Sequence, residues 1–210
     1  MDIKRLLALS GAAFVVVVLV VVIGFSGSTP GTDDSGAEIA SYYDKHEVRQ
    51  AIAAFLLAAT VPLLVVFASV LADTADAATA SLPTRAWRKL LVGGSLILGA
   101  VIVGTALIHF ALADGADNVS PGGLEALNML DNSFWVAANP ALGVMMLGAA
   151  GVILDRTQLA RWLGWAALLL GVALFIPYAD FFALLLSLLW IIVVSVMLYI
   201  SADTQHRSRP

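Results

Sequence analysis

Two kinds of residue are scarce in this sequence. Cysteine is absent, which excludes disulfides, thiolate metal sites and cysteine nucleophiles. Asp, Glu, Lys and Arg together make up only 12% of the chain, against about 25% in soluble domains. Apolar residues, in contrast, make up 60% of the 210 residues, and the mean hydropathy is +0.94. This composition predicts an integral membrane protein, and a net charge of -4 gives no reason to expect a nucleic-acid partner.

The motifs of common enzyme classes are missing as well. The sequence holds no Walker loop, no G-x-G-x-x-G element, no G-x-S-x-G element and no H-E-x-x-H spacing. No Asp or Glu lies deep inside an apolar segment, which weakens the case for an ion-coupled transporter. We therefore expect neither an enzyme nor a cofactor.

Long apolar segments predict an all-α, polytopic membrane protein. A helix needs roughly 20 apolar residues to cross the hydrocarbon core. Six segments fit this requirement, and they use nearly the whole chain, so we expect residues 1–210 to form a single domain, a six-transmembrane-helix bundle. The predicted spans are 6–25, 51–72, 90–113, 134–154, 162–177 and 181–200.

The first apolar segment has an alternative interpretation as a cleaved signal peptide. Such a peptide has an apolar region of about 7–15 residues, followed by a small-x-small cleavage site. Here the run from Leu6 to Phe25 is longer and ends in Gly24-Phe25-Ser26. A retained first span is therefore favoured.

Lysine and arginine predict how the helices are oriented. With an even number of spans, both termini lie on one side, which holds nine of the basic residues, while the opposite side holds only Lys45 and Arg49. By the positive-inside rule the termini are then cytoplasmic, in the plasma membrane. The nine residues are Lys4, Arg5, Arg85, Arg88, Lys89, Arg156, Arg161, Arg207 and Arg209.

Two amphipathic helical entries are predicted on the outer side. Ser35 and Glu38 have capping-box spacing, and Ser120-Pro121 resembles an N-cap followed by a first-turn proline. Pro62 lies inside the second span and should kink it. The face that follows the first entry carries Ile39, Tyr42, Tyr43, His46 and Gln50.

A stripe of amides marks the interior of the bundle. On one continuous helix, Asn128, Asn132, Trp135 and Asn139 fall on one arc. Unpartnered amides facing lipid are costly, so this arc should face protein or a water-filled vestibule. Water outside the membrane could also satisfy the first two amides. A structural hydrogen bond between helices is the other explanation for Asn139.

His109 is the only histidine in a predicted span, and intramembrane ionisable residues are candidates for function. One interpretation is a neutral ring bonded to a neighbouring helix. The other joins it to His46 and to Glu47, Asp131 or Asp180 near the outer face. Neither metal-ligand spacing nor a second intramembrane histidine supports a metal or haem.

The third span carries small residues that allow close helix contact. They are Gly94, Gly99, Ala100 and Gly104. We expect Ala100 and Gly104 to form the closest contact.

Three stretches carry a resemblance to a known family. They are Ser35-Gly-Ala-Glu-Ile-Ala-Ser-Tyr-Tyr43, Ala126-Leu-Asn-Met-Leu-Asp-Asn-Ser-Phe134 and Arg161-Trp-Leu-Gly-Trp165. Together they resemble a family of uncharacterised bacterial six-helix membrane proteins that carries only a domain-of-unknown-function label. The resemblance implies six helices and cytoplasmic termini, and it carries no activity to transfer.

The leading hypothesis is a membrane protein that binds or senses a lipid or small hydrophobic ligand in a pocket that opens outward. Its partner in every case is the lipid bilayer. The alternative is a structural or accessory subunit that docks a membrane protein partner or forms a homo-oligomer. The candidate ligand-binding residues are His109, Asn132, Trp135, Asn139, Asp131 and His46.

Overall fold

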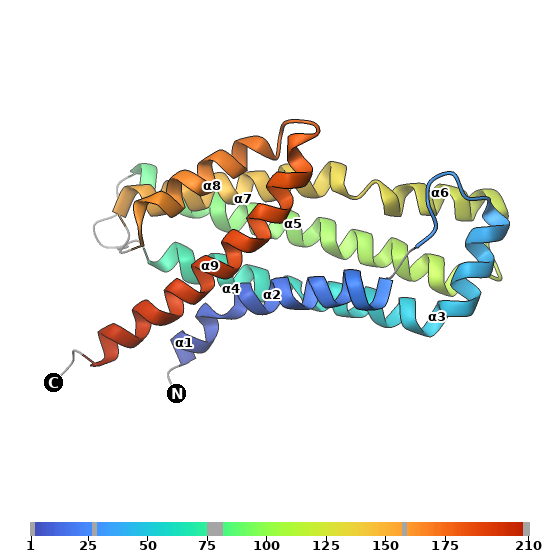
Figure 1. Cartoon of the computed structure of the whole chain (residues 1–210), viewed down its shortest axis with the longest axis horizontal. Coiled ribbons are helices and arrows are strands. Elements are labelled where there is room, and N and C mark those ends of the chain that lie inside the picture. Colours follow the sequence, from blue (N-terminus) through green and yellow to red (C-terminus); the bar gives the residue numbers. More distant parts are fainter. Residues whose placement is uncertain (1–2, 27–28, 75–81, 157–158, 208–210) are drawn as a thin grey trace. The chain divides into compact units, whose positions relative to one another are not determined.

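The computed structural model describes residues 3–26, 29–74, 82–156 and 159–207 (Figure 1). All regular elements in these ranges are helices, and the described residues contain no strand. The prediction of an all-α protein is therefore confirmed. The helices are α1 (Ile3–Ala8), α2 (Ser10–Leu19), the π-helix η1 (Val20–Ser26), α3 (Gly36–Ala59), α4 (Val61–Asp73), α5 (Leu82–Gly115), α6 (Pro121–Asn132), α7 (Trp135–Arg156), α8 (Arg161–Ala173) and α9 (Ala179–Arg207).

Four helical stretches are long and apolar enough to cross a membrane: Gly36–Asp73, Leu82–Gly115, Pro121–Asp155 and Ala179–Ser201. Two shorter apolar stretches, Ser10–Phe25 and Arg161–Ala173, fall below that length. Length and composition thus support a helical membrane protein with four spans of full length. Of the basic residues used for orientation, Arg209 lies outside the described residues.

The fifth predicted span is shorter than expected. Its helix α8 ends at Ala173 rather than at Pro177. The amides of Phe175 and Ile176 donate to carbonyls only three residues back, and Tyr178 then has a φ of 69°. A residue before proline disfavours the helical region, so the chain tightens and reverses here. The 13 residues of α8 rise about 20 Å, against a hydrocarbon core of about 30 Å.

The local signals for helix ends agree with the structure. Ser35 Oγ accepts from the Glu38 N–H at 3.4 Å, and Glu38 Oε2 accepts from the Ser35 N–H at 2.9 Å, which forms the capping box. Ser120 is the N-cap of α6 and Pro121 follows it, although the serine side chain makes no capping bond. The predicted effect of Pro62 is confirmed, because α3 stops at Ala59 and α4 begins at Val61.

The helix that carries the amide stripe is interrupted. Between α6 and α7, Ser133 and Phe134 form a turn, and the Ser133 N–H donates to the Leu130 carbonyl at 3.1 Å. The prediction of one continuous arc from Asn128 to Asn139 is therefore wrong.

The chain divides into two compact units, which we describe separately. The first unit comprises Met1–Val15, Pro62–Gly99 and Asn139–Pro210, and the second comprises Val16–Val61 and Ala100–Ala138.

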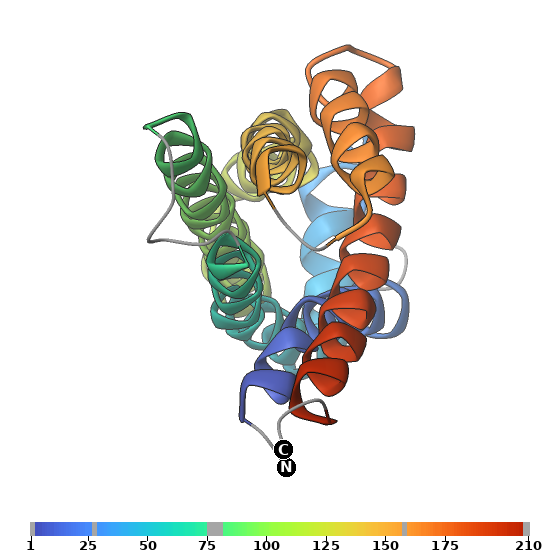
Figure 2. The same cartoon turned by 90° about the vertical axis from the view of Figure 1, so that its left-hand side faces the viewer.

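In the first unit, α9 packs along both α1 and α8, as two perpendicular views show (Figures 1 and 2). The Trp190 indole N–H of α9 donates to the Leu163 carbonyl of α8 at 3.0 Å. Helices α5 and α7 approach so closely that a Cβ on Gly94 would lie 2.5 Å from the Met145 backbone nitrogen. Gly94 therefore makes the close helix contact, whereas a Cβ on Gly104 would meet nothing within 4 Å. The expectation for Gly104 is wrong.

In the second unit, α3 packs against both η1 and α6. The two entry helices also meet near their starts, where the Gly36 N–H donates to Glu125 Oε1 at 2.7 Å. An apolar cluster fills the space between α3, α5 and α6, and its buried members include Ile39, Tyr43, Leu112, Ala113 and Leu124.

Candidate functional site: a buried polar cluster around His109

His109, on α5 in the second unit, is the centre of a buried polar cluster. Its side chain is 9% exposed, and that of Asp131 on α6 is 11% exposed. His109 Nδ1 lies 3.0 Å from Asp131 Oδ2, and Nε2 lies 2.8 Å from Oε1 of Gln50 on α3. One imidazole thus connects three helices.

The orientation of the Gln50 amide sets the role of the imidazole. Gln50 Nε2 donates to Tyr42 Oη at 2.9 Å and to the Phe25 carbonyl at 3.5 Å, so its Oε1 faces His109. Asp131 Oδ2 is an acceptor as well. Both ring nitrogens of His109 therefore have a polar partner, Asp131 Oδ2 at Nδ1 and Gln50 Oε1 at Nε2.

The cluster continues along α3, toward the start of that helix, to the second histidine. The Tyr42 ring stacks on His46 with centroids 4.6 Å apart, and His46 Nδ1 lies 2.8 Å from the Tyr42 carbonyl oxygen. The two histidines are thus linked through Tyr42 and Gln50 rather than by a direct bond. The Asp131 carboxylate contacts His109, while Glu47 is exposed.

Two buried oxygens beside His109 have no hydrogen-bond partner among the residues that the structure describes. They are Tyr43 Oη and Asp131 Oδ1. The Tyr43 side chain is fully buried, with its ring edge-on to His109 at 5.8 Å between centroids. Each such oxygen costs about 1–3 kcal/mol when it is left unpaired. The cluster thus keeps an open hydroxyl and an open acceptor next to the same imidazole.

The amides at the end of α6 bond the segment that precedes α3. Asn128 Nδ2 donates to the Gly31 carbonyl at 2.7 Å. Asn132 Nδ2 donates to the Pro30 carbonyl at 3.2 Å and to the Asn128 carbonyl at 2.9 Å. These bonds fasten the segment before α3 to α6. Asn132 therefore bonds backbone carbonyls, and among the described residues no hydrogen bond joins it to the imidazole.

The remaining predicted residues lie apart from the cluster's hydrogen bonds. Trp135 is 49% exposed at the start of α7. Asn139 belongs to the first unit, is only 3% exposed, and donates from Nδ2 to Asp180 Oδ2 at 2.9 Å. Asp180, which we considered as a partner of His109, is thus the partner of Asn139.

Comparison with known proteins adds no assignment. The chain matches no protein-family model, no curated protein and no solved structure. Within the described ranges, no three His, Cys, Asp or Glu side chains are grouped to hold a metal ion. The geometry of the polar cluster is thus the main guide to function.

Sequence reasoning found the histidine and its carboxylate but missed two other members of the site. Gln50 and Tyr43 were placed on the helix face that carries His46, without a functional role. Their spacing offered a signal, because residues 43, 46 and 50 recur at three and four positions and so share one side of a helix. A buried glutamine on that side needs a polar partner, and His109 provides it.

Proposed function

We propose that this chain is a multi-pass protein of the plasma membrane with six spans and cytoplasmic termini. Four spans have full length, and Ser10–Phe25 and Arg161–Ala173 would supply the shorter two. The nine-to-two distribution of basic residues supports the orientation, as does the packing of α1 along α9. The starts of α3 and α6 would then be the outward-facing amphipathic entries.

Cysteine labelling tests this topology without background, since the chain has no cysteine. We expect Asn118→Cys, after α5, to react with an impermeant thiol reagent added to intact cells. Ala86→Cys, near the start of α5, should react only after the cells are permeabilised. Labelling of Ala86→Cys from outside intact cells would overturn the orientation.

We propose further that the protein binds or senses a small molecule at the His109 cluster. The observation that carries this proposal is the pair of unpartnered buried oxygens, Tyr43 Oη and Asp131 Oδ1. Asp131 Oδ1 can only accept while ionised, and a tyrosine hydroxyl can donate or accept. The site therefore suits a molecule with a hydroxyl, amine or amide N–H. An apolar remainder would suit the surrounding residues, such as Ile39 and Leu112.

The position of these two oxygens supports a site rather than a packing defect. Three other buried side-chain atoms lack a partner among the described residues, namely Asn139 Oδ1, Ser187 Oγ and Ser195 Oγ. All three belong to the first unit. Tyr43 and Asp131 share a neighbour, because both contact His109. One ligand, or one ordered water that a ligand displaces, could bond both.

The decisive experiment compares two neighbouring tyrosines. In protein stripped of small molecules, Tyr43→Phe removes an unpaired hydroxyl, so thermal stability in detergent should stay unchanged or rise. Tyr42→Phe is the matched control, because it removes the acceptor of the Gln50 N–H and should cost about 1 kcal/mol. Mass spectrometry of molecules that copurify with the protein should show one that wild type and Tyr42→Phe retain and Tyr43→Phe loses.

Two results would count against the binding proposal. One is a loss of stability in Tyr43→Phe as large as that in Tyr42→Phe, which would mean that the hydroxyl is already paired. The other is identical copurifying material in all three proteins.

A structural or accessory role is the second candidate, and the amides favour it. Asn128 and Asn132 hold backbone carbonyls, and Asn139 holds Asp180. All three amides therefore serve contacts within the chain. If wild-type protein carries no specific small molecule and Tyr43→Phe is neutral, this candidate replaces the first. The partner would then be a membrane protein or a second copy of the chain.

A further inference from the structure

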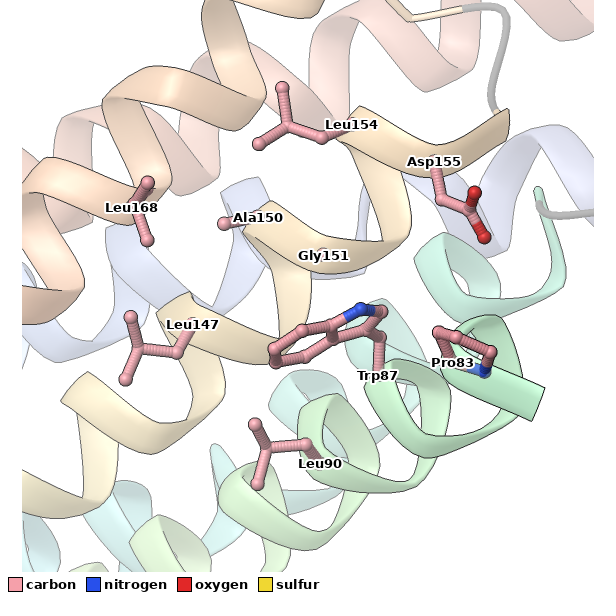
Figure 3. Close-up of a pocket in the computed structure, with 9 residues that line it drawn as sticks. All are labelled: Pro83, Trp87, Leu90, Leu147, Ala150, Gly151, Leu154, Asp155 and Leu168. Carbon is pink, nitrogen blue, oxygen red and sulfur yellow. The ribbon is translucent and has the colours of Figure 1, made fainter. Parts of the chain in front are cut away.

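The first unit contains a groove whose lining, unlike the polar cluster, is almost entirely apolar. The groove has a volume of about 430 Å³ and is lined by residues of α5, α7 and α8 (Figure 3). Pro83, Trp87 and Leu90 come from α5, Leu168 comes from α8, and α7 contributes side chains between Leu147 and Asp155. All of these except Asp155 are apolar or glycine.

A glycine shapes one wall of the groove. A Cβ on Gly151 would collide with the ring of Trp87, and for that reason only a glycine lets the indole lie directly on α7. Figure 3 shows the ring lying alongside this turn of the helix, between Pro83 and Leu147. Trp87 is still 39% exposed, so a large aromatic face remains uncovered by the chain itself.

The groove has the depth of one leaflet. The nine residues from Leu147 to Asp155 rise about 12 Å, close to half of a hydrocarbon core of about 30 Å. Its one polar residue lies at the end of α7, where Asp155 accepts a hydrogen bond from the Thr84 hydroxyl. Within a membrane, the apolar length would face acyl chains and the Asp155 end would face head groups.

Among the described residues, cations outnumber carboxylates at the Asp155 end. The starts of α5 and α8 bring Arg85, Arg88, Lys89 and Arg161, against Asp73 at the end of α4 and Asp155 at the end of α7. One arginine is already engaged, since Arg88 pairs with Asp73 at 2.6 Å.

Arg161 lies on the face of α8 that also carries the groove residue Leu168. It is exposed and lies seven residues before Leu168, which is close to two helical turns and places both on one face of α8. Basic residues at this level of a membrane helix attract anionic lipids.

We propose that the groove binds one acyl chain of an anionic phospholipid, whose phosphate is bound by Arg161 at the Asp155 end. The apolar walls exclude water from the acyl chain. An unfilled groove would lack the dispersion contacts that an occupant makes with the residues of its lining. The net positive end selects for the charge of the head group.

The test is retention of lipid by the full chain in mild detergent, measured by native mass spectrometry. Wild type is supplied with equal amounts of phosphatidylglycerol and phosphatidylcholine, and it should retain one phosphatidylglycerol preferentially. Leu168→Trp places a bulky ring in the groove and should abolish that retention. Leu169→Trp is the matched control, because Leu169 is 70% exposed and does not line the groove. It should behave as wild type.

The head-group contact is tested separately. Arg161→Gln should lower the affinity for phosphatidylglycerol about fivefold, the effect of one basic residue at a membrane surface. It should leave the affinity for phosphatidylcholine unchanged. Arg88→Gln is the control, because this arginine is already paired with Asp73.

Trp87 fluorescence provides a measurement that does not depend on a groove-filling variant. Phosphatidylglycerol with brominated chains should quench wild type more than Trp87→Phe, and the difference reports contact with the groove. Equal quenching of the two proteins would overturn the proposal. So would equal lipid retention by Leu168→Trp and Leu169→Trp, equal retention of the two phospholipids by wild type, or a dimer that only Leu168→Trp dissociates.

Discussion

Substitution of His109 alone should lower the free energy of unfolding more than substitution of both His109 and Asp131. In His109→Leu, the Asp131 carboxylate loses the one hydrogen-bond partner that the described residues give it, and Gln50 Oε1 loses its contact with Nε2 at 2.8 Å. Both side chains of the pair are about nine-tenths buried. Breaking a buried pair by deleting one partner costs about 3–5 kcal/mol.

The double variant His109→Leu/Asp131→Leu removes the stranded carboxylate. Replacement of both partners of a buried pair by apolar groups is often neutral or stabilising, and the Gln50 contact with His109 is lost to the same extent in the single and the double variant. We therefore expect the double variant to be more stable than His109→Leu alone by about 3–5 kcal/mol, the cost of the stranded carboxylate. A second substitution in the core would thus restore stability.

The assay is unfolding of the four proteins of this cycle in one detergent at one pH. Asp131→Asn is a useful fifth protein, since its amide oxygen can still accept from Nδ1 and its cost should be that of one weakened hydrogen bond, about 1 kcal/mol. Additive losses, with the double variant less stable than either single one, would refute the energetic coupling of His109 to Asp131. Those losses would instead indicate two side chains that stabilise the fold independently.

Two further predictions concern the first unit. Asn139→Asp places a carboxylate against Asp180 Oδ2, at the 2.9 Å now bridged by an amide donor, so it should cost about 3 kcal/mol or more in detergent unfolding. Addition of Asp180→Asn should recover part of that loss, whereas wild-type stability of Asn139→Asp would favour a water-filled vestibule. Gly94→Leu should cost about 1–3 kcal/mol or more by overpacking against Met145. In the same thermal assay Gly104→Leu should be nearly neutral, and the reverse order would contradict the packing of α5.

The sequence predicts features that depend on local chemistry. Membrane class follows from the shortage of charge, and the start of α3 follows from the Ser35–Glu38 capping box. Pro62 has no N–H to donate to the Ala58 carbonyl, and α3 ends just before it, where the Thr60 N–H donates to the Leu57 carbonyl three residues back, at 3.1 Å. Each of these rules acts within one helical turn. A single sequence is therefore enough to predict these features.

Features that depend on which faces meet are not local, and they were predicted poorly. Helix α7 continues through Pro140, in agreement with the predicted span 134–154, but the turn at Ser133-Phe134 that separates it from Asn128 and Asn132 was not predicted. Gly94 and Gly104 are equal as small residues of α5, and only the partner helix decides which one makes contact. Helical periodicity predicts which residues share one face of a helix, but it does not predict whether that face meets lipid, water or another helix.

The polar interior shows how a correct physical rule can point to the wrong atoms. The rule that buried amides need partners correctly implied that Asn128, Asn132 and Asn139 face something other than lipid. The structure gives them Gly31, Pro30 and Asp180 as acceptors, so their donors are engaged within the chain. A site for another molecule must be sought among groups that remain open after these bonds are counted. Beside His109, these are Tyr43 Oη and Asp131 Oδ1. A binding function therefore depends on the hydroxyl of Tyr43, a residue that is not part of the predicted amide stripe.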